Sequence, residues 1–159
     1  MFQIEDKYKI ANSNDLPFIT QNYTILHFDE FPILFTGSND DGDKIIGSLL
    51  YEDTETDTFR YTHAIVKDLD LKKFLRRQIS YRALIATAKV IFVIDKDIND
   101  NILSMYCIGY DKLPEDYLPL DSAYCPQFFV FDTGMEEHVV ILAQQVVRNN
   151  RSLWVKEAA

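Results

Sequence analysis

Hydrophobic and polar positions alternate through much of the first half of the chain, a period typical of β-strands. Residues 31–51 form two apolar runs around the pair Asp41-Gly42. Such a pair predicts a hairpin, because glycine adopts positive φ without a steric clash and aspartate tolerates it. Alternation in residues 59–66 places His63 on one face with three apolar neighbours. We therefore expect an antiparallel meander with strands in residues 23–28, 31–51 and 59–66.

After residue 66 the hydrophobic period lengthens to about 3.6, which is typical of an amphipathic helix. Leu71 and Phe74 begin its apolar stripe. Asp68 or Asp70 is expected to accept hydrogen bonds from the unpaired N–H groups of the first turn. Ser80 stands where a second short helix would need its own N-cap. Two consecutive helices are therefore expected to cover the meander.

A second hairpin is predicted after these helices. The continuous apolar run in residues 90–94 favours a strand that is buried on both faces. The chain is expected to turn at residues 99–101 and to return through residues 102–110. Prolines at three positions make residues 113–126 a crossing loop.

A third helix is predicted near the C-terminus. Thr133 and Glu136 form a capping-box pattern, and an apolar stripe follows in residues 139–147. We predict one α+β domain over residues 1–159: a two-layer structure with a mainly antiparallel sheet built from two hairpin units. Two consecutive helices lie between these units, and one amphipathic helix lies near the C-terminus. A chain of this length buries enough surface to fold without metal or disulfide support.

The whole chain has a formal net charge of −9. Its acidic residues are concentrated in the first part of the sequence. Residues 1–66 hold 12 acidic and 4 basic side chains, a net charge of −8, whereas residues 67–159 hold 13 and 12, a net charge of −1. This acidity argues against binding to nucleic acid, because it repels phosphate. Asp41, Asp43 and Glu55 lie in predicted turns and are candidate contacts for a basic protein partner. An ordinary solvated loop surface would have the same composition.

Basic residues gather on the first predicted helix. Lys72, Lys73, Arg76 and Arg77 recur at helical spacing. They are candidate contacts for a protein partner or for the acidic half of a second copy of this chain, so a homo-oligomer is one expected arrangement. A solvent-exposed helix face explains the same pattern. Phosphate or RNA is the weaker functional interpretation, given the acidity of the chain.

Candidate catalytic residues are few. A nucleophilic site needs a Cys or Ser with a His within reach. His27 and His63 fall on predicted strands, and a site that combines them with Cys107 or Cys125 is conceivable, although no spacing favours it. The chain lacks a glycine-rich phosphate loop, a nucleophile elbow and a Cys-x-x-Cys pair. We therefore expect no cofactor.

Alternate oxygen-bearing side chains in residues 95–101 imitate the opening of a calcium-binding loop. The rest of the pattern is missing, because Asp100 stands where the loop needs glycine and Tyr106 where it needs a bidentate glutamate. A hairpin turn stabilised by Asn and Asp side chains is the better interpretation. We therefore expect no metal site.

Four short motifs follow one another between residues 23 and 97. They are Phe-Pro-Ile-Leu-Phe, Asn-x-x-Gly-x-Lys, Tyr-Glu-Asp and Gln-Ile-Ser-Tyr-Arg. In this order they resemble a group of small bacterial and phage proteins with no established activity. The resemblance implies a bacterial or phage origin and this order of elements, and it implies no chemistry.

These observations lead to one functional expectation and one alternative. We expect a non-enzymatic, cytoplasmic protein-protein interaction module, including the role of a regulator or inhibitor in a defence or toxin context. The alternative is a small hydrolase or nuclease-like enzyme that uses His63 and nearby acidic residues. The chain has no apolar run of the roughly 20 residues that span a bilayer, and residues 1–11 lack the apolar core of a signal peptide. No membrane partner is therefore expected.

Overall fold

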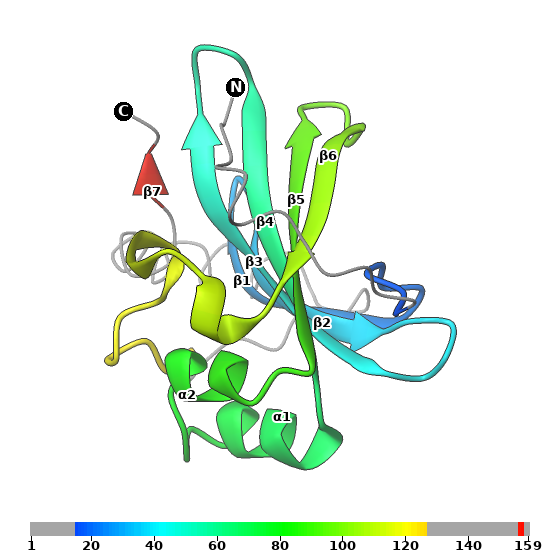
Figure 1. The fold of residues 1–159 in the computed structure, drawn as a ribbon, viewed down its shortest axis with the longest axis vertical. Coiled ribbons are helices and arrows are strands. Elements are labelled where there is room, and N and C mark those ends of the chain that lie inside the picture. Colours follow the sequence, from blue (N-terminus) through cyan, green and yellow to red (C-terminus); the bar gives the residue numbers. More distant parts are fainter. Residues whose placement is uncertain (1–14, 127–155, 158–159) are drawn as a thin grey trace, which may run out of the picture.

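The computed structural model describes residues 15–126 and 156–157. Six consecutive strands form one antiparallel sheet in chain order, and two short helices lie between the fourth and fifth strands (Figure 1). The elements are β1 Gln21–Asp29, β2 Phe31–Ser38, β3 Lys44–Asp53, β4 Thr58–Val66, α1 Asp68–Leu75, α2 Tyr81–Ala86, β5 Val90–Asp97 and β6 Ile102–Ile108. The predicted α+β class, the antiparallel meander and the placement of the two helices are confirmed.

The predicted hairpin joins β2 to β3. Gly42 has φ +81°, as the Asp-Gly turn requires. The side-chain oxygen of Asn39 accepts hydrogen bonds from the backbone N–H groups of Asp41 (3.0 Å) and Asp43 (2.9 Å). The turn is therefore stabilised by its own polar side chain, and the strands pair without a bulge from Leu34 to Ser38.

The two helices begin differently. Ser80 caps α2 as predicted, because its hydroxyl accepts a hydrogen bond from the Ala83 N–H at 3.1 Å. The expected aspartate cap of α1 is wrong, since Lys67 occupies the N-cap position and makes no side-chain hydrogen bond there. Asp68 lies inside the first turn instead and pairs with Lys72 at 2.9 Å. Its carboxylate still favours the helix through the macrodipole.

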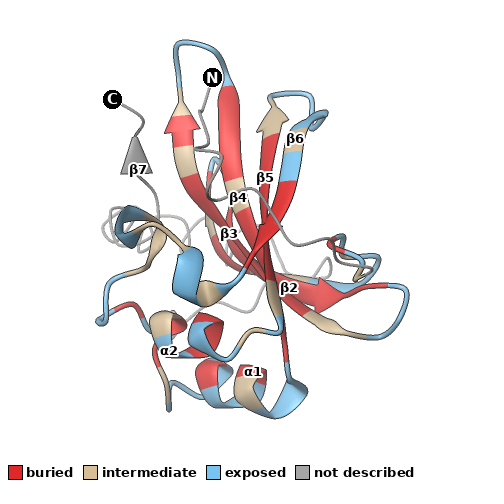
Figure 2. Cartoon of the chain, in the orientation of Figure 1, coloured by how far each residue is buried: buried red, intermediate tan, exposed pale blue. Residues whose placement is uncertain are grey.

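The register divides the sheet into two faces. Ala64 pairs with Ile46 and Ile91, and these side chains belong to the main core together with Phe74 and Leu84 of the helices. We call this side the helix face. Buried positions run along the central strands, whereas the outer sides of the helices are exposed (Figure 2).

His63 belongs to the other face. It lies opposite Gly47 on β3 and Phe92 on β5, and Gly47 in turn lies opposite Phe35 on β2. Directly paired residues of an antiparallel sheet project to the same side, so Phe35, His63 and Phe92 share a face. We call this side the cavity face.

Beyond β6 the chain runs through two short 3-10 turns, Tyr110–Lys112 and Glu115–Tyr117, which agrees with the predicted crossing loop. A two-residue strand, β7 (Lys156–Glu157), pairs in parallel with β3 at Tyr51 and Glu52. The predicted third helix lies outside the described residues. Within the described part of the chain, no helix is both long and apolar enough to cross a bilayer.

Candidate functional site

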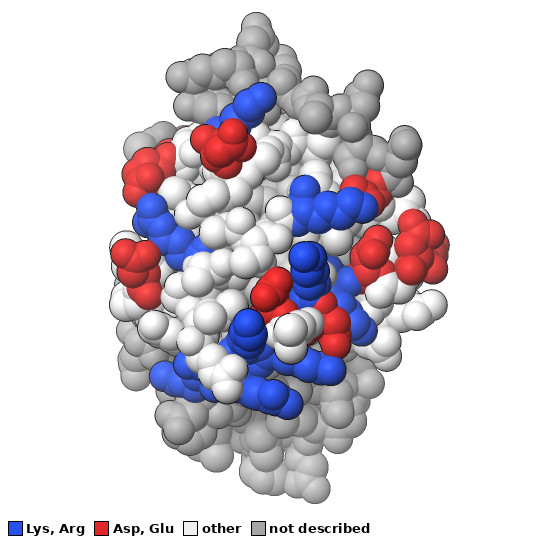
Figure 3. Space-filling model, turned by 60° about the horizontal axis from the view of Figure 1, so that its bottom comes forward, with Lys and Arg blue, Asp and Glu red and all other residues white. Residues whose placement is uncertain are grey.

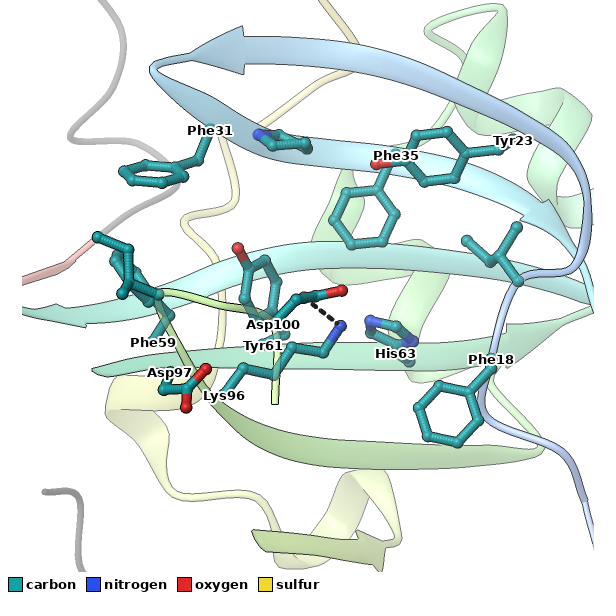
Figure 4. A pocket seen from close by; sticks show the side chains of 13 residues that line it. Phe18, Tyr23, Phe31, Phe35, Phe59, Tyr61, His63, Lys96, Asp97 and Asp100 are labelled. Carbon is teal, nitrogen blue, oxygen red and sulfur yellow. Dashed lines mark hydrogen bonds and ion pairs between the residues drawn. The ribbon is translucent and has the colours of Figure 1, made fainter. Parts of the chain in front are cut away.

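A cavity of about 500 Å³ opens on the cavity face of the sheet (Figure 4). Residues from four strands (β1, β2, β4 and β5), the N-terminal segment and the β5–β6 turn line it. Six of these residues are aromatic: Phe18, Tyr23, Phe31, Phe35, Phe59 and Tyr61. This volume falls within the range of small-ligand sites, which are mostly apolar with a few polar groups that orient the ligand.

Phe35 is the central ring of the wall. Its centroid lies 5.6 Å from that of Tyr23, 6.1 Å from that of Tyr61 and 5.5 Å from that of His63. The ring lies across Gly47, where an added Cβ would stand 2.2 Å from Phe35 Cε2. The absence of a side chain at Gly47 therefore allows Phe35 to lie against the sheet and leaves the space above it open.

One ion pair lies at the polar end of the cavity. Lys96 Nζ is 3.1 Å from Asp100 Oδ1 and 5.5 Å from the centroid of the Tyr61 ring. Figure 4 shows the Lys96 ammonium between Tyr61 and the His63 ring, with Asp100 directly beside it. Burial, with a smaller contribution from Asp100, raises the pKa of Tyr23 to about 12. The phenol is therefore neutral at physiological pH.

His63 is the most deeply buried polar residue of the lining, with 4% of its surface exposed. Its Nδ1 lies 2.7 Å from the backbone carbonyl oxygen of Pro17. Burial lowers the pKa of the imidazole to about 4, and the nearby Lys96 acts in the same direction against the Pro17 hydrogen bond. The ring is therefore neutral at pH 7.

The neutral charge of His63 also determines its tautomer. A carbonyl oxygen only accepts hydrogen bonds, so the proton of the neutral ring is on Nδ1. Nε2 is then an unprotonated acceptor, and it is buried without a hydrogen-bond partner among the described residues. Buried polar atoms in this state are uncommon in proteins, which makes His63 the most informative residue of the cavity.

The β5–β6 turn forms one wall of the cavity through Asp97, Ile98 and Asp100. Asp97 accepts hydrogen bonds from the backbone N–H groups of Asn99 and Asn101, each at 2.9 Å. This confirms the predicted hairpin turn with Asx bonds. Among the described residues, no group of three or more His, Cys, Asp or Glu side chains is arranged to hold a metal ion.

The catalytic candidates from the sequence do not converge. Cys107 lies two strands from His63 in the same row, with Phe92 between them, which separates the backbones by about 10 Å. His27 pairs with Leu34 of the helix-face core, and Cys125 belongs to that core as well. Burial raises the pKa of both thiols, that of Cys125 to about 11, so neither is an activated nucleophile. The proposed combination of histidine and cysteine is therefore not assembled.

The acidic candidates lie at opposite ends of β3. Asp41 and Asp43 are in the β2–β3 turn, and Glu55 is in the β3–β4 turn. The ten residues of β3 separate these turns by about 30 Å. These three residues therefore do not form a single acidic binding pocket.

The basic candidates form a surface at the end of α1. Lys72 and Lys73 lie in the last turn of α1, while Arg76 is its C-cap and Arg77 lies beyond it with φ +61°. Arg77 Nη1 donates a hydrogen bond to the Cys125 carbonyl oxygen at 3.2 Å. Lys and Arg side chains gather toward one end of the molecule in Figure 3, with carboxylates among them. These residues do not share a cavity with the acidic candidates.

The helix face holds a second polar cluster, which is closed. Arg60 and Asp95 form a buried ion pair, with Nε 2.7 Å from Oδ1 and Nη2 2.8 Å from Oδ2. Ser104 also donates to Asp95 at 2.8 Å, and Arg60 donates to the Tyr117 hydroxyl. Because donors and acceptors are matched within the protein, this cluster fixes the loop after β6 to the sheet and offers no free group to a ligand.

Most of the cavity could not be predicted from the sequence. The alternation in residues 59–66 placed His63 on one face with three apolar neighbours, but Phe35, Lys96 and Asp100 had no signal of their own. The strand pairing brings them together across β2, β4 and β5. Alternation indicated each face, whereas the neighbours of each residue depended on register.

No family model, curated protein or solved structure matched this chain. The resemblance to small bacterial and phage proteins thus stays an expectation from the sequence.

Proposed function

We propose that this protein is a non-enzymatic binding module and that the aromatic cavity is its binding site. The observation that carries the proposal is a ring-lined cavity of about 500 Å³ with one buried acceptor, His63 Nε2, that the described residues leave unpaired. A ligand in this space would cover apolar ring surface and remove the cost of the unpaired acceptor. Both effects favour the bound state.

Binding fits the cavity better than catalysis does. A general base works best when its pKa is near the operating pH, whereas the pKa of His63 is lowered to about 4. Asp97 and Asp100 line the same cavity, but Asp97 is held by the turn and Asp100 by Lys96. The hydrolase alternative with His63 and nearby acids therefore has acidic neighbours but lacks an activated base.

A protein partner is compatible with this proposal, because the cavity would also accept an aromatic side chain presented by another protein. In that case the charged turns and the basic end of α1 would contribute outer contacts, where charge governs association rate and specificity more than affinity. A regulator or inhibitor in a defence or toxin context is a narrower form of the same proposal. A second copy of the chain is one partner to test.

The proposal is tested by reducing the cavity. Gly47→Ala places a methyl group against Phe35 and drives that ring into the open space, so we expect affinity for small aromatic compounds to fall at least tenfold. Ligand-observed NMR followed by calorimetry measures the loss. Gly109→Ala is the matched control, because its new Cβ meets only the side chain of Asp111, at 2.7 Å from Oδ1.

Two results would contradict the proposal. The first is that the wild-type protein binds none of a set of small aromatic compounds at millimolar concentration. The second is that Gly47→Ala and Gly109→Ala bind the same compounds equally well while both remain folded.

A further inference from the structure

If the cavity is the binding site, as proposed above, the chemistry of its lining restricts the class of ligand that it can bind. We infer that it takes a neutral aromatic ring carrying an N–H or O–H donor, and that His63 Nε2 accepts the hydrogen bond from this donor. The inference rests on three features: the tautomer of His63, the balance of charges in the lining, and the arrangement of the rings.

The tautomer requires a donor on the ligand. Nδ1 is engaged with the Pro17 carbonyl oxygen at 2.7 Å, so the neutral ring presents a lone pair at Nε2. In Figure 4 the His63 ring lies beside the end of the Lys96 side chain. The ammonium of Lys96 is paired with Asp100 at 3.1 Å and makes no hydrogen bond to His63 Nε2. A ligand without a donor would leave the acceptor buried and unpaired, or would place its own lone pair against it.

The lining holds two carboxylates and one ammonium, so it disfavours an anion, and its ammonium already lies over the Tyr61 ring, where a cationic ligand would bind. A cation would meet the Lys96 ammonium, which already lies 5.5 Å from the centroid of the Tyr61 ring. An anion would meet Asp97 and Asp100, which belong to the same lining. His63 contributes no charge at neutral pH. A neutral molecule avoids both repulsions and the desolvation of its own charge.

The rings favour a flat aromatic ligand over an aliphatic alcohol. Phe35 stands at 79° to His63, and Phe31 lies 5.0 Å from Phe59 between centroids. Aromatic rings gain from offset and edge-to-face contacts in addition to the area that they bury. Indole and phenol rings combine such a surface with a single donor at the edge. These two ring types are therefore the simplest representatives of the ligand class.

The test compares indole with benzofuran in the wild-type protein. The two molecules have nearly the same shape, but benzofuran has an ether oxygen in place of the N–H donor. We expect indole to bind about three- to tenfold more tightly by calorimetry, the range that a single neutral hydrogen bond supplies. The imidazole Nε2 resonance of His63 should shift on addition of indole and not on addition of benzofuran.

A variant locates the acceptor. His63→Phe keeps a flat ring and removes Nε2, so the ratio of the two affinities should fall to about one while benzofuran still binds. Tyr61→Phe removes the hydroxyl of a neighbouring lining residue and should leave the ratio unchanged. If His63→Phe does not fold, the wild-type comparison and the Nε2 resonance still decide the matter. The inference is overturned if Tyr61→Phe abolishes the ratio and His63→Phe does not.

The outcomes separate this inference from the proposed function. If neither ring binds, the cavity is not the binding site and both proposals fail. If both rings bind with equal affinity, the cavity binds ligands but the donor requirement is wrong.

N-Acetyltryptophanamide distinguishes the sources of the ring: its binding indicates an aromatic side chain on a polypeptide, and binding of indole alone indicates a free small molecule. Either result supports the ligand class.

Discussion

The two faces of the sheet bury polar groups in opposite ways. On the helix face, Arg60 and Asp95 are joined through two hydrogen bonds, and the hydroxyls of Tyr81, Ser48 and Thr62 form a buried chain with both distances at 2.9 Å. On the cavity face, His63 Nε2 is buried with no partner among the described residues, beside an open space of about 500 Å³. Strands of one sheet thus carry a closed polar network and an incomplete one.

This difference indicates where the protein is built for stability and where it is available for binding. A buried polar group that is fully paired specifies one packing arrangement and has nothing left to offer. A buried group that lacks a partner reduces stability until a ligand supplies one. The comparison therefore predicts large stability losses on the helix face and a pH-sensitive, ligand-sensitive response on the cavity face.

The largest effect is expected for the ion pair of the helix face. Asp95→Ala leaves the Arg60 guanidinium buried without its counter-charge, so we expect the free energy of unfolding to fall by about 3–5 kcal/mol. Urea denaturation followed by circular dichroism measures the change. Asp68→Ala is the control, because its partner Lys72 and Asp68 itself are both more than half exposed and the pair is screened by water. Equal losses of unfolding free energy in the two variants would contradict the prediction, because they would show that the buried ion pair stabilises the protein no more than the exposed one.

His63 should give the next largest effect, as a dependence of stability on pH. Its pKa falls from an ordinary 6.5 to about 4 on folding, because burial disfavours the charged ring. The imidazole is therefore protonated in the unfolded chain at a pH where it is still neutral in the folded protein. The free energy of unfolding declines as the pH falls from about 6.5 to about 4. The decline attributable to this residue is up to about 3 kcal/mol.

The pH effect is checked by comparing wild type with His63→Phe across that window. The variant lacks the titrating ring, so its stability should decline less steeply between pH 6.5 and pH 4. Carboxylates contribute equally to both proteins and cancel in the difference. Parallel stability curves would mean that His63 is accessible to protons in the folded state and would weaken the assignment of its tautomer.

A smaller effect is expected when a tyrosine hydroxyl is removed from each face of the sheet in turn. Tyr81→Phe breaks the buried chain to Ser48 and should cost about 1–2 kcal/mol. Tyr61→Phe removes a hydroxyl that lines the cavity and makes no hydrogen bond to the described residues, so its stability should stay within about 0.5 kcal/mol of wild type. Thermal denaturation of the two variants provides the comparison, and similar losses in both would remove the distinction between the faces.

Local features could be predicted because their causes are local. The Asp-Gly pair specifies the β2–β3 turn, the hydroxyl of Ser80 caps α2, and the Asx bonds of Asp97 form the β5–β6 turn. Each depends on residues within a few positions of one another. The aspartate cap of α1 was predicted from equally local evidence and is wrong, because the helix begins at Asp68 and both Asp68 and Asp70 lie inside its first turn.

The site could not be predicted in this way, because it depends on register. The chain by itself determined an antiparallel α+β fold and the face of the sheet on which His63 lies. Only the tertiary structure decided that Gly47 lies between Phe35 and His63, that Phe92 separates His63 from Cys107, and that Pro17 holds Nδ1. A shift of one residue between strands would move the strand neighbours among these residues to the opposite face. The alternation of side chains is encoded along the chain, whereas the partner of each side chain is set by pairing between strands distant in sequence.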